Sequence, residues 1–266
     1  MLEFMNQFQP QNQVTGHFDQ AAQEYFDWYR LPTPEGHSFR IRKTRCLELL
    51  KDVPAGSTVI DIGCGPGIMV EELLNRGFKV IGLDIAPQMI EQCRTRFGRN
   101  PNASFAVAGA QQIPYPDQSA DVLLAMGLME YLNEEDRVIT EFLRVLKPGG
   151  FAIVTYPNYW SLSRIWDRFT HLLAYPYLHL RRRNQTVVTG VKHREYRLNQ
   201  TRELLQRAGF RVTDVVFYNF KLAFRPLDKW APKFFVKLAE KLESRARSKV
   251  WRQIGTGFIL KAERPT

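Results

Sequence analysis

Cysteine is scarce in this sequence, and long apolar runs are missing from it. The three cysteines, Cys46, Cys64 and Cys93, stand apart, without a C-x-x-C pair or a nearby histidine cluster. Neither a disulfide framework nor a metal site is therefore indicated. No stretch approaches the roughly eighteen uninterrupted apolar residues of a membrane span, and the N-terminal region has no basic-then-apolar signal. The sequence predicts a cytoplasmic protein that does not cross a membrane, and it leaves a peripheral position at the membrane open.

Acidic residues are also too few to balance the basic ones. The 266 residues include 37 Lys and Arg against 27 Asp and Glu, which gives a net charge of +10. Such an excess favours an anionic partner, which can be a nucleic acid, a lipid surface or an acidic substrate. The hydrophobic content of 44% is enough for the core of one globular α/β domain with insertions.

A glycine-rich loop between two apolar runs is the most informative feature of the chain. Residues 58–62 are mostly apolar, Gly-Cys-Gly-Pro-Gly follows at 63–67, and a helical segment leads to a second apolar run that ends at Asp84. This order predicts a β-α-β unit. Gly63 and Gly65 let the backbone turn sharply and approach a ligand. A carboxylate at the end of the second strand can accept hydrogen bonds from both hydroxyls of a ribose, so the unit predicts an adenosine site.

The spacing of this loop distinguishes between adenosine cofactors. Dinucleotide folds usually carry G-x-G-x-x-G, whereas this loop reads G-x-G-x-G and has Ile68 where the third glycine would be. Asp61 lies two residues before Gly63, and a carboxylate there repels a phosphate but attracts an ammonium or sulfonium group. The cofactor is therefore predicted to be cationic, which disfavours a nicotinamide oxidoreductase.

Three motifs together resemble those of the class I S-adenosylmethionine-dependent methyltransferases. An acidic residue, any residue and Gly-x-Gly-x-Gly at 61–67 match the first motif of that family. The residues at 113–121 are similar to its Leu-Pro-Phe-x-Asp turn, and Val-Leu-Lys-Pro-Gly-Gly at 145–150 matches its turn before strand five. The resemblance is firm over 61–155 and weak in two stretches nearer the C-terminus.

The resemblance implies an α/β fold: a Rossmann-like, seven-stranded, mostly parallel sheet with helices on both faces and the last strand antiparallel. Residues 1–266 would form a single methyltransferase domain. Its expected parts are an N-terminal helical cap at 18–50, a cofactor-binding core at 57–156, an aromatic substrate or lid insertion at 157–200, and a basic amphipathic insertion at 219–254. We expect helices at 18–29, 39–50, 68–75, 87–97, 133–146 and 201–208, and strands at 58–62, 80–84, 103–107, 120–125, 151–155, 210–218 and 257–262.

The resemblance also implies which residues bind the cofactor. Asp61, Gly63 and Gly65 would line the methionine end. Many relatives hold the adenine amino group with an aspartate where this chain has a glycine, so Gln111 or nearby backbone would substitute. Residues 18–25 are similar to a Phe-Asp-x-x-Ala-x-x-Tyr segment that lies over the pocket, although a helix that merely packs on the core fits them equally. The predicted cofactor is S-adenosyl-L-methionine, and its predicted binding residues are Tyr25, Asp61, Gly63, Cys64, Gly65, Asp84, Ile85, Gln111 and Met126.

In-line methyl transfer depends mainly on positioning, so a general base is optional. The segment at 126–131 is similar to one that often ends Glu-His in the family, where the histidine sometimes serves as base. Tyr131 takes that place here, and a phenol with an unperturbed pKa of about 10 is a poor base near neutrality but can orient an acceptor. His193 is the other candidate catalytic residue, although a lone surface histidine is the simpler interpretation, and His37 has the same status.

The two insertions show features of substrate or surface contact. Aromatic residues between Tyr159 and Tyr177, followed by three arginines, favour a substrate lid. In the second insertion cations recur every fourth residue, and an apolar seam accompanies them (Phe234, Phe235, Leu238 and Leu242). Such a basic amphipathic helix commonly lies on an anionic membrane surface, here through 221–252, but a surface helix whose seam packs on its own sheet fits slightly better. No RNA-binding motif accompanies the charges, which disfavours nucleic acid.

These features together predict an enzyme, a methyltransferase that moves a methyl group by in-line displacement from S-adenosylmethionine to a small organic acceptor, lipid-like or anionic in character. The alternative is a non-catalytic cofactor-binding or membrane-associating module on the same fold. An RNA methyltransferase and a nicotinamide oxidoreductase are less favoured. The acceptor atom and the oligomeric state are not encoded in any pattern recognised here.

Overall fold

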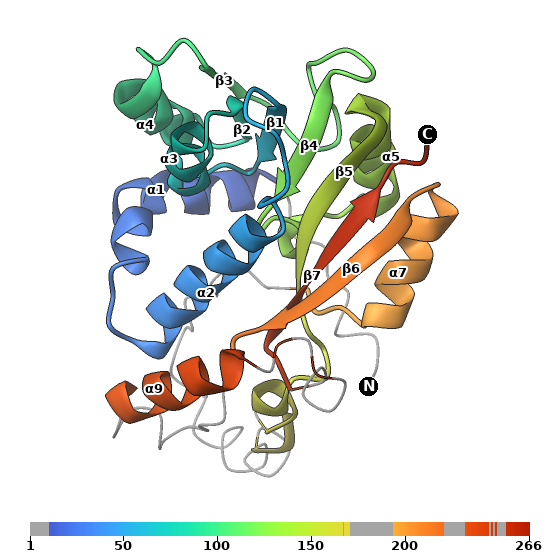
Figure 1. Ribbon diagram of the computed structural model, residues 1–266. Coiled ribbons are helices and arrows are strands. Elements are labelled where there is room, and N and C mark those ends of the chain that lie inside the picture. Colours follow the sequence, from blue (N-terminus) through green and yellow to red (C-terminus); the bar gives the residue numbers. More distant parts are fainter. Residues whose placement is uncertain are drawn as a thin grey trace.

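The computed structural model describes residues 11–166, 168–170, 194–220, 232–244, 246, 248 and 254–266. Within them a twisted sheet of seven strands runs through the molecule in the order β3-β2-β1-β4-β5-β7-β6 (Figure 1). Neighbouring strands are parallel except that β7 is antiparallel to both β5 and β6. The predicted fold class is therefore confirmed. The strands are β1 (Thr58–Ile62), β2 (Lys79–Asp84), β3 (Ala103–Val107), β4 (Ala120–Ala125), β5 (Leu146–Pro157), β6 (Arg211–Tyr218) and β7 (Gly257–Glu263).

Helices cover both faces of this sheet, with α2 in front of it and α5 behind it in Figure 1. Most of them connect one parallel strand to the next, as expected for alternating strands and helices. The helices are α1 (Gln11–Trp28), α2 (Pro34–Glu48), α3 (Ile68–Asn75), α4 (Pro87–Phe97), α5 (Glu135–Val145), α7 (Leu198–Arg207), α9 (Pro232–Glu243) and the 3-10 turn η2 (Met129–Tyr131).

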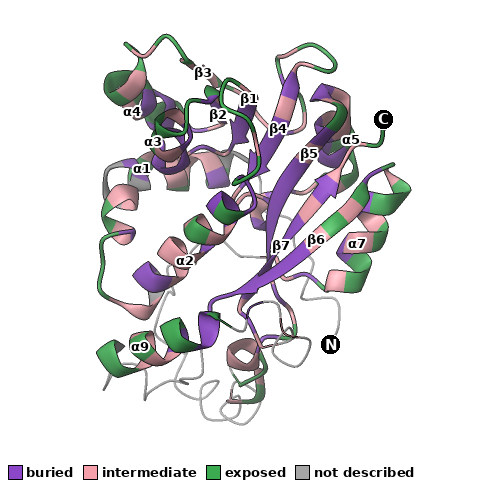
Figure 2. Ribbon diagram, in the orientation of Figure 1, coloured by how far each residue is buried: buried purple, intermediate pink, exposed green. Residues whose placement is uncertain are grey.

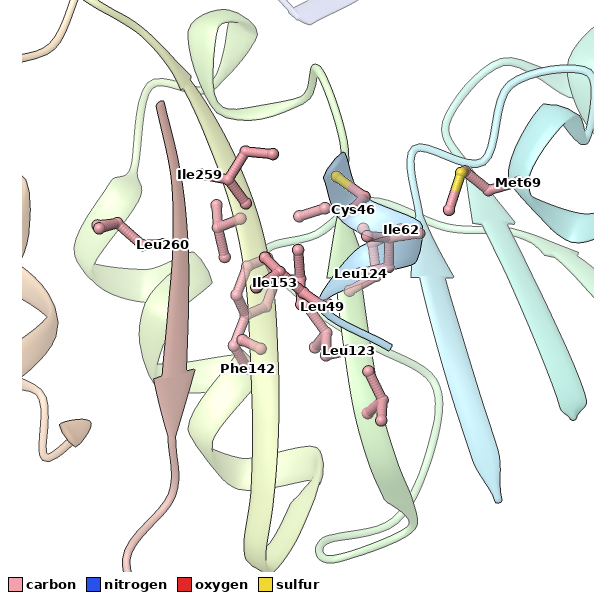
Figure 3. Close-up of a cluster of buried hydrophobic side chains, with 14 of the residues drawn as sticks. Cys46, Leu49, Ile62, Met69, Leu123, Leu124, Phe142, Ile153, Ile259 and Leu260 are labelled. Carbon is pink, nitrogen blue, oxygen red and sulfur yellow. The ribbon is translucent and has the colours of Figure 1, made fainter. Parts of the chain in front are cut away.

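The central strands are buried on both faces, as their nearly continuous apolar sequences require. Leu123 and Leu124 of β4 and Ile153 of β5 have no exposed surface, and Phe142 of α5 packs beneath them. Figure 2 shows the burial along β4 and β5, and Figure 3 shows these side chains meeting in one cluster. Burying each such side chain contributes roughly 1.5–3 kcal/mol to the stability of the fold. This core therefore holds the central strands in fixed positions.

Three boundaries differ most from the sequence prediction. Helix α1 begins at Gln11 instead of at residue 18, and it buries Val14. The second helix begins at Pro34 instead of at residue 39. Thr33 caps that helix by accepting a hydrogen bond from Gly36 N, and proline is favoured in the first turn. Strand β5 extends back to Leu146, with a register shift over the Pro-Gly-Gly turn.

The basic helix α9 is anchored to the end of β6. The buried carboxylate of Glu243 accepts hydrogen bonds from Asn219 N at 2.7 Å and Phe220 N at 3.3 Å, and it pairs with Arg45 of α2. Leu242 is buried and Leu238 is half-buried, so most of the predicted seam packs on the protein itself. Among the residues described, no helix has the length and apolarity needed to cross a membrane.

The first insertion is described only at its two ends. Asn158 forms an isolated parallel bridge with Tyr196, and Glu195 pairs with Arg164 and Arg168. The helical stretch from 162 is thereby tied to the chain that leads into α7. The predicted lid residues between 171 and 193, His193 included, lie outside the described residues, as do the predicted cations between 221 and 231.

Candidate active site

A cavity lies at the carboxyl edge of the parallel strands, where α1 closes it. It opens to solvent, and about 630 Å³ of space lies within it when the open mouth is included. Its walls come from the loops that follow β1, β2, β3 and β4. The predicted catalytic Tyr131 lines this cavity. Most of the predicted cofactor residues line it too: Tyr25, Gly63, Gly65, Asp84, Ile85, Gln111 and Met126.

The glycine loop is held in place by backbone hydrogen bonds. The N–H groups of Gly63 and Cys64 both donate to Leu83 O, at 2.7 and 3.0 Å. Gly63 and Gly65 have φ angles of 70° and 53°, in the left-handed region that favours glycine. The loop therefore turns next to the end of β2, and its backbone forms the floor of the cavity.

Asp84 joins the loop to the helix that follows β2. Its Oδ2 accepts a hydrogen bond from Gly65 N at 2.9 Å, and its Oδ1 accepts one from Ala86 N at 2.9 Å. Each carboxylate oxygen can accept a second hydrogen bond. The side chain is half-buried and lines the cavity, so it can still receive a pair of hydroxyl groups, as the sequence predicts for a ribose.

Asp61 lies behind the cavity wall. It is 1% exposed, and its Oδ2 has no hydrogen-bond partner. Burial, followed by repulsion from Asp84, raises the pKa of Asp61 to about 8. An unpaired buried carboxyl group is costly, and a cationic ligand in the cavity would compensate for it. This orphaned oxygen therefore fits the predicted cationic cofactor.

Cys64, like Asp61, is a predicted cofactor residue whose side chain does not line the cavity. Its Sγ lies 4.0 Å from the Sγ of Cys93 on α4 and 3.6 Å from Gly65 O. A Cβ on Gly82 would come within 3.1 Å of the same sulfur. The thiol fills space between the glycine loop, β2 and α4, so it contributes no surface to the cavity.

The adenine end of the predicted site is formed after β3. Ile85 and residues 108–110 line it, and a Cβ on Gly109 would lie 3.0 Å from Oε1 of Gln111. The Gln111 amide therefore covers the place that an aspartate side chain at 109 would occupy. This arrangement supports the predicted substitution of Gln111 for that aspartate.

Arg42 is a functional candidate that the sequence interpretation missed. Its side chain on α2 is 9% exposed, and its Nη1 lies 2.6 Å from the position that a Cβ on Gly127 would take. Gly127 lines the cavity with a φ of 71°, so the guanidinium packs directly on the cavity wall. Within the described part of the chain no carboxylate forms an ion pair with it, and its Nε has no partner. The signal was the helical spacing from Arg42 to the buried Cys46 and Leu49, which puts the arginine on the core-facing side.

The remaining wall of the cavity is apolar and aromatic. Val14 and Phe18 come from α1, Leu128 and Leu132 from the segment after β4, and the Tyr131 ring meets Phe18 edge-on at 5.0 Å. Burial raises the pKa of Tyr131 above its ordinary value, so the phenol stays protonated at neutral pH.

Two ionisable side chains near Tyr131 and on α2, Glu130 and His37, do not line the cavity. Glu130 is buried, and Oε2 of its side chain has no hydrogen-bond partner. Arg194, the residue after His193, donates its N–H to Glu130 O at 3.1 Å. His37 lies buried on α2, where burial lowers its pKa.

The acid-flanked glycine loop on a mostly parallel sheet with antiparallel β7 is the arrangement predicted for a class I S-adenosylmethionine-dependent methyltransferase domain. Residues 60–154 match the model of a family described as a methyltransferase domain. The recognition, enzyme class and cofactor predicted from the sequence are thus confirmed for this domain.

Known relatives agree with this assignment over part of their length. A probable S-adenosylmethionine-dependent methyltransferase of Mycolicibacterium smegmatis is 31% identical over 171 residues, 64% of this chain and 58% of that protein. The 2-methyl-6-phytyl-1,4-hydroquinone methyltransferase of Synechocystis is 35% identical over 136 residues, 46% of this chain and 43% of that protein. The chain therefore spans about half the length of these relatives.

Solved structures share the fold. A chain in the complex between the Haloferax volcanii Trm112 methyltransferase activator and a methyltransferase superposes with a TM-score of 0.62 at 21% identity. The match covers 94% of this chain and 98% of that one. At this identity the likeness concerns the fold alone.

Proposed function

We propose that this chain transfers a methyl group from S-adenosylmethionine to a small organic acceptor with an apolar body. The observation that carries the proposal is the division of the cavity. One half presents Asp84 and the loop backbone, with the buried Asp61 and Arg42 behind its wall, and the other half is apolar. A polar, charged cofactor and an apolar acceptor would meet between them.

In this proposal each polar residue holds one part of the cofactor. Asp84 accepts hydrogen bonds from the ribose hydroxyls, and Ile85 and Gln111 contact the adenine. The Arg42 guanidinium, which pairs with no carboxylate among the described residues, binds the carboxylate of the methionine half. Asp61 offsets the positive charge of that half. The bound cofactor supplies an electrophilic methyl group on sulfur, and the protein holds the acceptor in line with it.

The acceptor half favours an organic molecule with aromatic or aliphatic surface. Phe18 and Tyr131 present ring edges and faces to it, and Leu128 adds aliphatic surface. The hydroquinone named for the Synechocystis relative is such a molecule. A relative in Arabidopsis thaliana is named as a tRNA methyltransferase, so the prediction that nucleic acid is disfavoured is not confirmed. The apolar wall supports the organic acceptor over a nucleotide.

Positioning, without a strong base, accounts for the chemistry in this proposal. The protonated phenol of Tyr131 can donate a hydrogen bond to the acceptor and orient it, but it cannot take up a proton at neutral pH. His193 as a base stays a prediction. An acceptor that needs no deprotonation before transfer, or that ionises by itself, suits this site.

Cofactor titration tests the proposal first. S-adenosylhomocysteine should raise the melting temperature of the protein, and NAD should not. Transfer of a labelled methyl group to 2-methyl-6-phytyl-1,4-hydroquinone or a simpler alkylated hydroquinone then tests the acceptor class. Absence of S-adenosylhomocysteine binding contradicts the whole proposal. Binding with transfer only to tRNA contradicts the acceptor class alone.

We also propose that α9 gives the protein a peripheral position on an anionic membrane. Lys233, Lys237 and Lys241 are exposed at four-residue spacing along the helix, and Phe234 beside them is 63% exposed. A basic face that carries an exposed aromatic ring is typical of helices at membrane surfaces. Sedimentation with anionic vesicles should fall when the three lysines are changed to glutamate. A matched control changes Lys51, Lys79 and Arg99, exposed cations near the opposite edge of the sheet, to glutamate.

A further inference from the structure

The exposed apolar side chains are concentrated in the two insertions. Among the described residues, the large hydrophobic side chains with the greatest exposure outside the insertions are Leu31 and Val107, at 41% and 48%. The others all lie in residues 160–169 or on α9: Trp160 50%, Ile165 40%, Trp166 38%, Phe169 52% and Phe234 63%. Exposed apolar patches of this kind mark contact surfaces.

The helical stretch after β5 carries these side chains on one face. Ile165 and Phe169 are four residues apart, which places them one above the other on a helix, and the Trp166 ring lies 6.2 Å from that of Phe169. Trp160 stands just before this stretch, with the Arg197 guanidinium 5.4 Å from its ring centre. We refer to the aromatic face formed by Trp160, Ile165, Trp166 and Phe169.

The aromatic face and α9 belong to the same edge of the sheet as the cavity. β5 and β6 both run antiparallel to β7, so they are parallel to each other and end at the same edge. β5 leads at Pro157 into the aromatic face, and β6 leads at Tyr218 toward α9. β1 ends at this edge too, in the glycine loop. Figure 1 shows α9 and the helical stretch after β5 at the lower end of the molecule.

We infer that the aromatic face inserts into the interface of an anionic lipid bilayer while the lysines of α9 bind its headgroups, so that the cavity-bearing edge of the sheet faces the membrane. Tryptophan and phenylalanine favour the boundary between headgroups and acyl chains, and lysines are attracted to anionic headgroups. The charge of α9 complements such a surface. The inference rests on the proposed apolar acceptor, because such a molecule partitions into the lipid.

Salt separates the contributions of the two contacts. Lysine binding to headgroups weakens as ions screen the charges, whereas burial of apolar side chains does not depend on charge. In vesicles of mixed phosphatidylcholine and phosphatidylglycerol, the full chain should bind at low salt and retain a measurable part of this binding at roughly 0.5 M salt. The variant Trp160→Ser/Ile165→Ser/Phe169→Ser should lose about tenfold or more of the affinity that remains at high salt.

The matched variants decide the outcome. Lys233→Glu/Lys237→Glu/Lys241→Glu should lose the salt-sensitive part only, and Leu31→Ser/Val107→Ser should bind like the parent. The inference is overturned if the parent does not bind vesicles, or if the aromatic variant binds as tightly as the parent at high salt. Stabilisation by S-adenosylhomocysteine, measured without vesicles, verifies that each variant is folded. Failure of that stabilisation in the parent contradicts the proposed methyltransferase function instead.

Discussion

The two halves of the cavity are held by different forces. The proposed cofactor half is formed by loops on adjacent strands, where Leu83 O accepts two loop amides and Asp84 accepts two more N–H groups. The acceptor half is closed by α1, whose Ala22 packs against Ala86 and Met89 in a small cluster outside the main core. Backbone hydrogen bonds specify the first half and side-chain packing the second. A change of acceptor therefore requires only new side chains on α1 and after β4.

The largest loss of cofactor binding is expected from Asp84→Ala. This change removes the acceptor for the N–H groups of Gly65 and Ala86 as well as the proposed ribose contact, and hydrogen bonds to charged groups contribute about 1.5–3 kcal/mol each. Affinity for S-adenosylhomocysteine, measured by titration calorimetry, should fall by about 100-fold or more. The control Asp117→Ala removes a mostly exposed carboxylate that pairs with Arg144, and it should bind like the parent. An affinity for Asp84→Ala near that of the control would contradict the assigned role.

Arg42→Leu should have the next largest effect, about 10- to 100-fold on S-adenosylhomocysteine. The proposed contact is with the methionine carboxylate, so 5′-methylthioadenosine, which lacks that group, should bind the variant and the parent equally. Gly127→Ala should resemble Arg42→Leu, because its Cβ would displace the guanidinium and its φ of 71° disfavours alanine. Equal losses for the two ligands would indicate a general distortion of the cavity and contradict the carboxylate contact.

Asp61 should couple cofactor binding to pH. With a pKa of about 8 the carboxyl is mostly protonated at neutral pH, and a cationic ligand should lower that pKa and release a proton. Binding of S-adenosylmethionine should therefore tighten as pH rises toward 8, by up to about tenfold per unit at the steepest. Calorimetry in buffers of different ionisation enthalpy should detect the released proton. Asp61→Asn should abolish both effects, and a pH dependence that persists in this variant would assign them elsewhere.

The raised pKa of Asp61 also predicts how the free energy of unfolding changes with pH. Because the folded-state pKa of Asp61 is above its unfolded value, its carboxyl favours folding below pH about 4. That contribution is lost as pH rises toward 8. Urea unfolding of the free protein across this window should show a steeper decline for the parent than for Asp61→Asn. Parallel curves would contradict the raised pKa.

The smallest effect on the cofactor is expected from Tyr131→Phe, which changes only the acceptor half. Affinity for S-adenosylhomocysteine should stay within about twofold of the parent. In the transfer assay the KM for the acceptor should rise by roughly 3- to 10-fold, the cost of one hydrogen bond. Phe18→Leu serves as the comparison, because it keeps an apolar side chain and removes the ring contact with Tyr131. A large loss of cofactor affinity in Tyr131→Phe would contradict the division of the cavity.

The sequence predicted that Gly63, Gly65 and Asp84 lie together, and the structure places all three on one cavity. Gly63, Gly65 and Asp84 belong to one β-α-β unit, so their spacing alone brought them together. Arg42 was missed because its contact with Gly127 joins segments far apart in the sequence. The prediction for Cys64 considered its position in the loop but could not show that its thiol points toward Cys93.

The basic helix illustrates a different limit. The apolar seam of α9 was predicted from helical spacing, and Leu242 is indeed buried, but Phe234 is exposed among the lysines. Helical spacing alone cannot tell that Leu242 is buried and Phe234 exposed. The rotation of the helix about its axis is set by Glu243, which accepts hydrogen bonds from the end of β6. A buried glutamate in a basic segment was the available signal.

The separate packing of α1 has a consequence for turnover. Tyr25 and Phe18 pack around the small cluster formed with α4, apart from the side chains that stabilise the sheet. Swinging α1 outward exposes few buried groups, so the free-energy cost of opening is far below that of unfolding. In the proposed reaction, spent cofactor would leave and fresh cofactor would enter by this route while the sheet stays intact. The rate of that opening would then set an upper limit on the rate of methyl transfer.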